Sequence, residues 1–136
     1  MEKKDIVLDV KKLNTSFISD KKEIKIVKDV SFQLKRGTTL AIVGESGCGK
    51  SVTVHSVMRL LASNSKFAAE KVTYLEKKED GSIVEHDLGK MNPRGKEIRA
   101  LRGPHLSMVF QDPMSSLNPV YRVGDQVAEG LLEHNK

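Results

Sequence analysis

The chain has 136 residues, of which 38% are hydrophobic and 30% are charged, and its formal net charge is +5. Leu, Ile, Val and Phe make up about 28% of the residues, above the ~20% below which chains tend to stay disordered. No run approaches the ~18 apolar residues of a membrane-spanning helix, and the single cysteine, Cys48, excludes an internal disulfide. We therefore expect one domain at most, and neither an integral membrane protein, a disulfide-stapled secreted domain nor a disordered tail.

The excess of basic residues raises the hypothesis of nucleic-acid binding. Basic and acidic residues alternate, however, with eight Lys or Arg and six Asp or Glu between residues 71 and 103. Six scattered aromatic residues also make a poor platform for stacking bases. Mixed charge of this kind is typical of a solvated surface, so we expect no nucleic-acid partner.

Residues 5–35 show the alternation of apolar and polar side chains that predicts half-buried β-strands. The first run begins at Ile6 and a second run covers residues 30–34, while a polar stretch at residues 19–23 interrupts the pattern. Arg36-Gly37 ends it as a turn. We expect an antiparallel β region here.

Residues 38–61 follow a different pattern. Leu40–Val43 is continuously apolar, which is typical of a strand covered on both faces. Three glycines follow within residues 44–49, and a helical pattern opens at Lys50. Strand, glycine loop and helix form the first half of a βαβ unit. The helix is predicted to bury a stripe of side chains spaced three and four residues apart: Val54, Val57, Met58 and Leu61.

Residues 62–105 are predicted to form a surface excursion with a β-hairpin around Asp80-Gly81 and a short helix between Asn92-Pro93 and Gly103-Pro104. Residues 106–123 begin with a second buried-strand candidate, 106–110, that runs into a polar loop. Residues 124–136 are predicted to begin a helix with an apolar stripe, and the pattern stops within about three turns.

The sequence Gly44-Glu45-Ser46-Gly47-Cys48-Gly49-Lys50-Ser51 matches the phosphate-binding pattern G-x-x-x-x-G-K-[ST] throughout. Successive backbone N–H groups in a tight glycine loop converge on a polyphosphate, and the following helix adds the positive end of its dipole. The position of Lys50 suits contact with the β- and γ-phosphates. The Ser51 hydroxyl suits ligation of Mg²⁺, which prefers oxygen ligands.

Together with its flanks, this segment resembles the Walker A sequence of ATP-binding cassette (ABC) transporter ATPases. Residues 108–119, Met-Val-Phe-Gln-Asp-Pro-Met-Ser-Ser-Leu-Asn-Pro, resemble the Q-loop segment of the oligopeptide and dipeptide importer branch, and Val123–Val127 continues that pattern. The resemblance covers the whole chain but only about the first half of such a domain. It implies an α/β fold with a P-loop NTPase core, a partly parallel sheet and an antiparallel β subdomain, truncated before the bulk of the helical subdomain.

The resemblance also implies roles for single residues. Phe17 corresponds to an aromatic that stacks on adenine, with a strand-end core phenylalanine as the alternative. Gln111 corresponds to the Q-loop glutamine, which senses the γ-phosphate and Mg²⁺ and links nucleotide state to the membrane subunits; the alternative is a polar strand cap. The implied ATP-binding residues are Phe17, Gly44, Glu45, Ser46, Gly47, Cys48, Gly49, Lys50, Ser51 and Val52, with Lys50 and Gln111 as catalytic residues and Ser51 and Gln111 as Mg²⁺ ligands.

By the same resemblance, the protein is an ATP-binding subunit that drives import of peptides or related small solutes, on the cytoplasmic side of the membrane. Its expected partners are transmembrane permease subunits, a second ATP-binding subunit and, indirectly, an extracytoplasmic solute-binding protein. The signature sequence, the Asp-Glu strand and the switch histidine of such ATPases are absent from this sequence, so the 136-residue chain alone is expected to be inactive.

Two alternatives stay open at this point. The chain is a truncated fragment that only binds nucleotide, or it is a small P-loop kinase in which residues 106–110 form the Walker B strand and Asp112 supplies the Mg²⁺ carboxylate. Against the kinase, Gln111 interrupts the apolar run before the acid, and residues 113–127 have no task.

Overall fold

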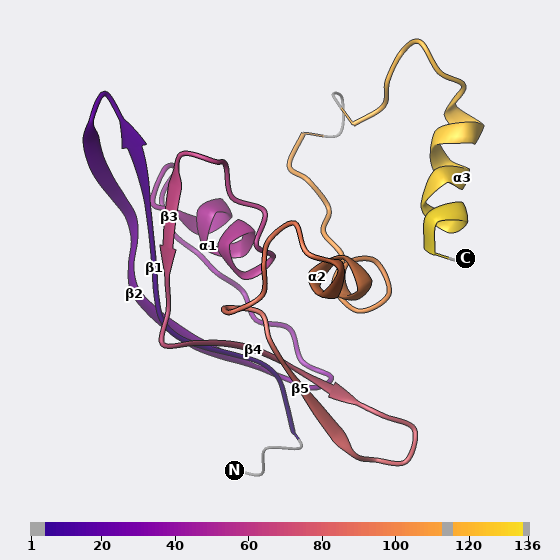
Figure 1. Ribbon diagram of the computed structural model, residues 1–136, viewed down its shortest axis with the longest axis horizontal. Helices are drawn as coiled ribbons and strands as arrows, with labels where there is room; N and C mark the ends of the chain where they lie inside the picture. The colour runs from indigo at the N-terminus through magenta and orange to yellow at the C-terminus, as the bar shows by residue number, and fades with distance from the viewer. Residues whose placement is uncertain (1–4, 113–115, 135–136) are drawn as a thin grey trace. The chain divides into compact units, whose positions relative to one another are not determined.

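The computed structural model describes residues 5–112 and 116–134. These residues divide into two compact units, one on each side of the Pro93–Arg94 peptide bond. The first unit holds all the strands and one helix, and the second holds two helices, as the labels in Figure 1 indicate.

The first unit is built on two long antiparallel strands, β1 (Ile6–Ser19) and β2 (Lys22–Lys35). They are joined by a two-residue turn in which Asp20 and Lys21 both have positive φ, 49° and 63°. Two positive φ values are the signature of a type I′ turn, which matches the right-handed twist of the strands it connects. The polar stretch at residues 19–23 is therefore the tip of a hairpin.

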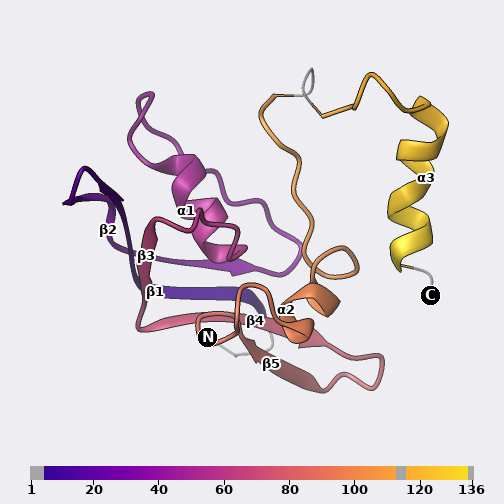
Figure 2. The same cartoon turned by 45° about the horizontal axis from the view of Figure 1, so that its top comes forward.

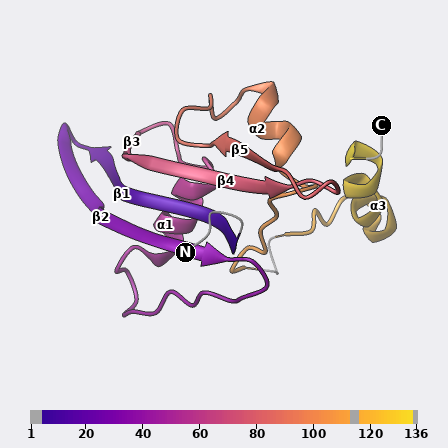
Figure 3. The ribbon, with the colours of Figure 1, turned by 90° about the horizontal axis from the view of Figure 1, so that it is seen from below.

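Three shorter strands complete the sheet: β3 (Ser65–Ala68), β4 (Lys71–Lys77) and β5 (Ile83–Asp87). The strand order is β2-β1-β4-β5, and β3 pairs with the distal half of β1. All of these pairings are antiparallel, and Figure 3 shows β2, β1, β4 and β5 side by side. The hairpin expected around Asp80-Gly81 is β4–β5, with Gly81 at φ 81°.

The core of this unit lies on the central strands β1 and β4. Val10 and Leu13 on β1 and Val72 and Leu75 on β4 expose 1% or less of their surface. Helix α1 (Lys50–Val57) packs on one face of the sheet, where it contacts β1 and β2 (Figure 2). Its buried residues are Thr53, Ser56 and Val57. Val54 is 41% exposed, so the predicted apolar stripe of this helix was wrong at that position: the helix turns its small hydroxyl residues toward the sheet.

Neither of the two predicted buried strands is a strand in this structure. Residues 40–43 have no regular secondary structure, and Val43 is 88% exposed. In residues 106–110, only Leu106 makes a bridge, a parallel one to Arg102, and Val109 is 99% exposed. A strand needs a neighbour for its N–H and C=O groups, and a parallel neighbour comes from a distant segment. No described strand pairs with either run, so the predicted parallel core sheet is not formed by the residues the structure describes.

The second unit contains α2 (Lys96–Leu101) and α3 (Val123–His134). Ile98 and Leu101 are buried, whereas the apolar residues Val127, Leu131 and Leu132 of α3 are 66–67% exposed. The Gln126 amide donates to the carbonyls of Asn118 and Tyr121 at 2.9 and 3.0 Å and accepts from the Asn118 N–H at 2.7 Å. One side chain thus fastens the preceding turn to the start of α3. Among the described residues, no helix is long and apolar enough to cross a membrane.

Candidate functional site: a glycine loop at the start of a helix

The glycine loop leads directly into α1, the position that the phosphate-binding pattern requires. Gly47 and Gly49 have φ values of 80° and 94°, which residues with a Cβ rarely adopt. A Cβ on Gly44 would lie 2.6 Å from the Cys48 sulfur. The backbone angles therefore favour glycine at positions 47 and 49, and a side chain at position 44 would displace the Cys48 sulfur.

The Lys50 side chain folds back over the loop. Its ammonium donates to the carbonyl oxygens of Gly44 and Glu45 at 2.7 and 2.6 Å and lies 3.6 Å from the Cys48 sulfur. The loop therefore curls around a positive charge. The N–H groups in the first turn of a helix have no partner within the helix, so the start of α1 combines free donors, dipole and cation in one place.

Strand β2 packs against Gly49, the last glycine of the loop. Thr15 pairs with Val27 and the next residue, Ser16, pairs with Lys25, so Ile26 is an extra residue on β2. Such a bulge lets two consecutive side chains act on one side of the strand. A Cβ on Gly49 would lie 3.2 Å from Ile26 Cγ2 and 3.7 Å from Val27 Cγ2. The contact of Ile26 and Val27 with Gly49 was not predicted, because neither Ile26 nor Val27 belongs to the phosphate-binding sequence pattern.

A buried hydrogen bond fixes α1 on β1. The hydroxyl groups of Thr15 and Ser56 lie 2.7 Å apart, and Ser56 also donates to the Val52 carbonyl at 2.6 Å. Since the single Ser56 proton goes to Val52, Thr15 is the donor to Ser56. Thr15 therefore faces α1. Sequence patterns give no signal for this bond, because its partners are 41 residues apart.

Phe17 lies on the same face of the sheet as the glycine loop. Residues 14–17 of β1 pair with β3 in unbroken register, and side chains two apart in a regular strand share a face. Phe17 therefore follows Thr15 toward the α1 side, and its neighbours across the sheet are Ile24 and Ser65. Two residues after Ile24 on β2 comes Ile26, which lies next to Gly49, the last glycine of the loop. The half-buried Phe17 and the glycine loop are thus both adjacent to the same stretch of β2.

Gln111 and Asp112 lie in the second unit, on an exposed bend after residues 106–110. Asp112 does not end a buried strand here, which removes the structural support for a kinase-type Walker B carboxylate. The roles of Gln111 toward phosphate and Mg²⁺ remain predictions. Within residues 5–112 and 116–134, no cluster of three or more His, Cys, Asp or Glu side chains is placed to hold a metal. The Ser51 hydroxyl is exposed in the first turn of α1, where it suits a cation held jointly with a bound phosphate.

Comparison with known proteins shows which family this sequence is similar to. A family model described as ABC transporter matches residues 27–136. The dipeptide transport ATP-binding protein DppD of Bacillus subtilis (strain 168) is 47% identical over 130 residues, which cover 96% of this chain and 36% of DppD. DppD of Lactococcus lactis subsp. cremoris (strain MG1363) is 42% identical over 130 residues, 96% of this chain and 34% of the relative.

The glutathione import ATP-binding protein GsiA of Escherichia coli (strain K12) is 43% identical over 128 residues, which cover 94% of this chain and 20% of GsiA. The chain thus spans about a third or less of the length of these relatives. The family match, in contrast, extends from β2 to the last residue and includes the whole glycine loop. With this match over well over half of its length, the chain belongs to the ABC transporter family.

Proposed function

We propose that this chain is the N-terminal part of the ATP-binding subunit of an ABC importer, in which ATP binding and hydrolysis drive uptake of di- or oligopeptides or related small solutes. The observation that carries the proposal is the glycine loop at the start of α1, curled around the Lys50 ammonium. The names of two relatives, a dipeptide transport and a glutathione import ATP-binding protein, support this class of solute.

In this proposal the Lys50 ammonium, which now donates to the carbonyl oxygens of Gly44 and Glu45, binds the β- and γ-phosphates of ATP instead. The backbone N–H groups from Gly44 to Val52 bind the phosphates, and the Lys50 ammonium neutralises their charge. The Ser51 hydroxyl, with Gln111 from the Q-loop, would hold Mg²⁺, which supplies charge neutralisation and orientation of the triphosphate. Phe17 would stack on the adenine ring.

The partners proposed for the complete protein are transmembrane permease subunits and a second ATP-binding subunit, with a solute-binding protein acting indirectly. We place the subunit at the cytoplasmic face of the membrane, held there by the permease. The 136-residue chain by itself is proposed to bind ATP without steady turnover, because residues that position the attacking water have not been found in it. Sustained phosphate release from the purified chain, absent in Lys50→Ala, would contradict this part.

Uptake of a labelled dipeptide by cells tests the proposed function. Cells that produce the complete protein with Lys50→Ala should lose uptake, since the triphosphate then lacks its cation. Lys90→Ala serves as the matched control, because its side chain is 88% exposed and pairs with the surface residue Asp87. Retained uptake in Lys50→Ala, or equal loss in both variants, would overturn the proposal.

A further inference from the structure

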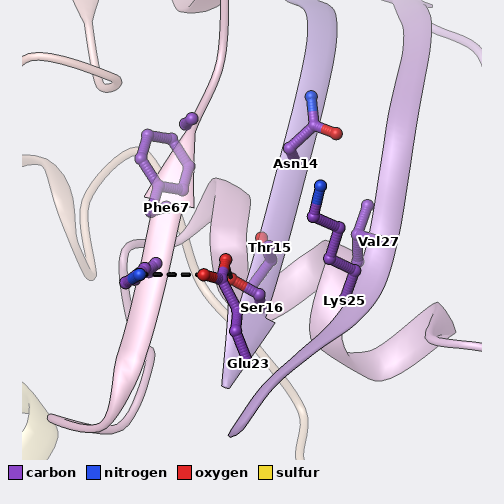
Figure 4. Close-up of a pocket in the computed structure, with 9 residues that line it drawn as sticks. Asn14, Thr15, Ser16, Glu23, Lys25, Val27 and Phe67 are labelled. Carbon is purple, nitrogen blue, oxygen red and sulfur yellow. Dashed lines mark hydrogen bonds and ion pairs between the residues drawn. The ribbon is translucent and has the colours of Figure 1, made fainter. Parts of the chain in front are cut away.

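Three strands are tied together by polar contacts directly behind Phe17. The Ser16 hydroxyl on β1 donates to Glu23 Oε1 on β2 at 2.6 Å, and Lys66 on β3 pairs with Glu23 Oε2 at 2.8 Å. Each carboxylate oxygen of Glu23 thus binds a different strand. We call Ser16, Glu23 and Lys66 the strand clamp. Figure 4 shows Ser16 and Glu23 lying together on β1 and β2.

The strand clamp occupies the face of the sheet opposite to Phe17. Ser16 precedes Phe17 in a regular stretch of β1, so their side chains point to opposite faces. Lys66 pairs directly with Ser16, and Ser65, its neighbour, pairs with Phe17. On β2, Ile24 pairs with Phe17 and is the residue after Glu23. The three clamp residues are therefore the immediate chain neighbours of the three residues that form the Phe17 level of the sheet.

An open pocket of about 510 Å³ is lined by parts of β1, β2 and β3, and its lining residues include all three clamp residues (Figure 4). The hydrogen bond between Ser16 and Glu23 and the ion pair between Glu23 and Lys66 join residues of all three strands at this pocket. Ser16 is 5% exposed, and the hydrogen bonds from Lys66 and then Ser16 lower the pKa of Glu23, which favours its carboxylate form. Two hydrogen bonds between Ile18 and Asn64, at 2.8 and 3.2 Å, add a further tie on the other side of Phe17.

We propose that Glu23 is a positioning residue for the nucleotide base: by joining β1, β2 and β3, it holds the Phe17 ring at the level where adenine stacks. This inference rests on the proposed role of Phe17 and extends it. Glu23 does not touch the nucleotide. Its removal leaves the glycine loop unchanged, since Ile26 and Thr15 hold that loop and its helix.

The test compares two ligands that differ in the base, MgATP and magnesium tripolyphosphate, by titration calorimetry of the full chain. Glu23→Gln should weaken MgATP binding roughly threefold, the effect typical of losing an exposed ion pair, and leave tripolyphosphate binding unchanged. The charge exchange Glu23→Lys with Lys66→Glu should restore much of the MgATP affinity. Glu70→Gln is the control, because it removes a comparable exposed ion pair with Lys12 on β1, 3.0 Å long, and should change neither affinity.

Parallel measurement of Phe17→Ala separates this inference from the proposed function. Loss of MgATP affinity in Phe17→Ala but not in Glu23→Gln would overturn the positioning role alone. Unchanged MgATP affinity in Phe17→Ala would remove the stacking platform and with it the inference. Equal weakening of both ligands by Glu23→Gln would show a general structural effect and would also overturn it.

Discussion

The antiparallel sheet and the two apolar runs at residues 40–43 and 106–110 differ in a way that hydrophobicity alone does not predict: the long strands β1 and β2 mix apolar with polar residues, the two runs are almost entirely apolar, and only the strands are paired in a sheet. In the sheet, β1 pairs with β2 across a two-residue turn, and β4 pairs with β5 across a short loop. The apolar runs have no such local neighbour, and Val43 and Val109 remain 88% and 99% exposed. Apolar sequence predicts that a segment will be buried, but only a partner strand makes it a strand.

The sharpest difference between the two regions is the free energy lost when an apolar side chain is shortened. Leu13→Ala removes a fully buried side chain on β1 and should destabilise the protein by about 2–5 kcal/mol. Val109→Ala, at a 99% exposed position, should change stability by less than about 0.5 kcal/mol. Urea unfolding of both variants measures the contrast, and comparable losses would mean that residues 106–110 are buried in solution.

The contact between helix and sheet should depend on one hydrogen bond. Thr15→Val leaves the buried Ser56 hydroxyl without its donor and should lower the free energy of unfolding by about 1–3 kcal/mol. Ser65→Ala is a suitable control, because its hydroxyl bonds an exposed carbonyl in a loop and its loss should cost little. If the double variant Thr15→Val with Ser56→Ala were as destabilised as the sum of the single variants, the two hydroxyls would not be coupled.

Two glycine-to-alanine changes should act in opposite directions. Gly49→Ala places a Cβ on a residue with φ 94°, 3.2 Å from Ile26, and should destabilise the loop by about 1–2 kcal/mol. Gly130→Ala lies within α3, with nothing within 4 Å of the added Cβ, and should stabilise that helix by about 0.5–1 kcal/mol. Thermal unfolding distinguishes the two signs, and a stabilising Gly49→Ala would contradict the described loop conformation.

The smallest expected effect is a pH dependence at the edge of the core. Burial raises the pKa of Asp9, but its hydrogen bonds from Lys71 at 2.6 Å and Gln33 at 3.0 Å outweigh burial and lower it. A folded-state pKa below the unfolded value contributes stability above the unfolded pKa, and this stability is lost as pH falls through the folded value. As the pH falls below about 4, the free energy of unfolding of Asp9→Asn should therefore decrease less than that of the unmodified protein. Parallel acid-unfolding curves for the two proteins would contradict the shift.

The sequence predicted those features that depend on neighbouring residues. Asp80-Gly81 marked a hairpin, and the glycine pattern ending at Lys50 marked a loop followed by a helix. The turn at Asp20-Lys21 was missed because a polar stretch without glycine or asparagine carries no strong turn signal. The bulge at Ile26, the bond between Thr15 and Ser56 and the strand clamp could not be predicted, because each depends on strand register between distant residues.

The most direct test of the central claim is a calorimetric titration of MgATP into the full chain and its Lys50→Ala variant, with Lys90→Ala as the control. The account predicts that binding is lost in Lys50→Ala, because the loop of residues 44–51 then has no cation opposite the β- and γ-phosphates, and that it is kept in Lys90→Ala. Undiminished affinity in Lys50→Ala would contradict the assignment of this loop as the triphosphate site.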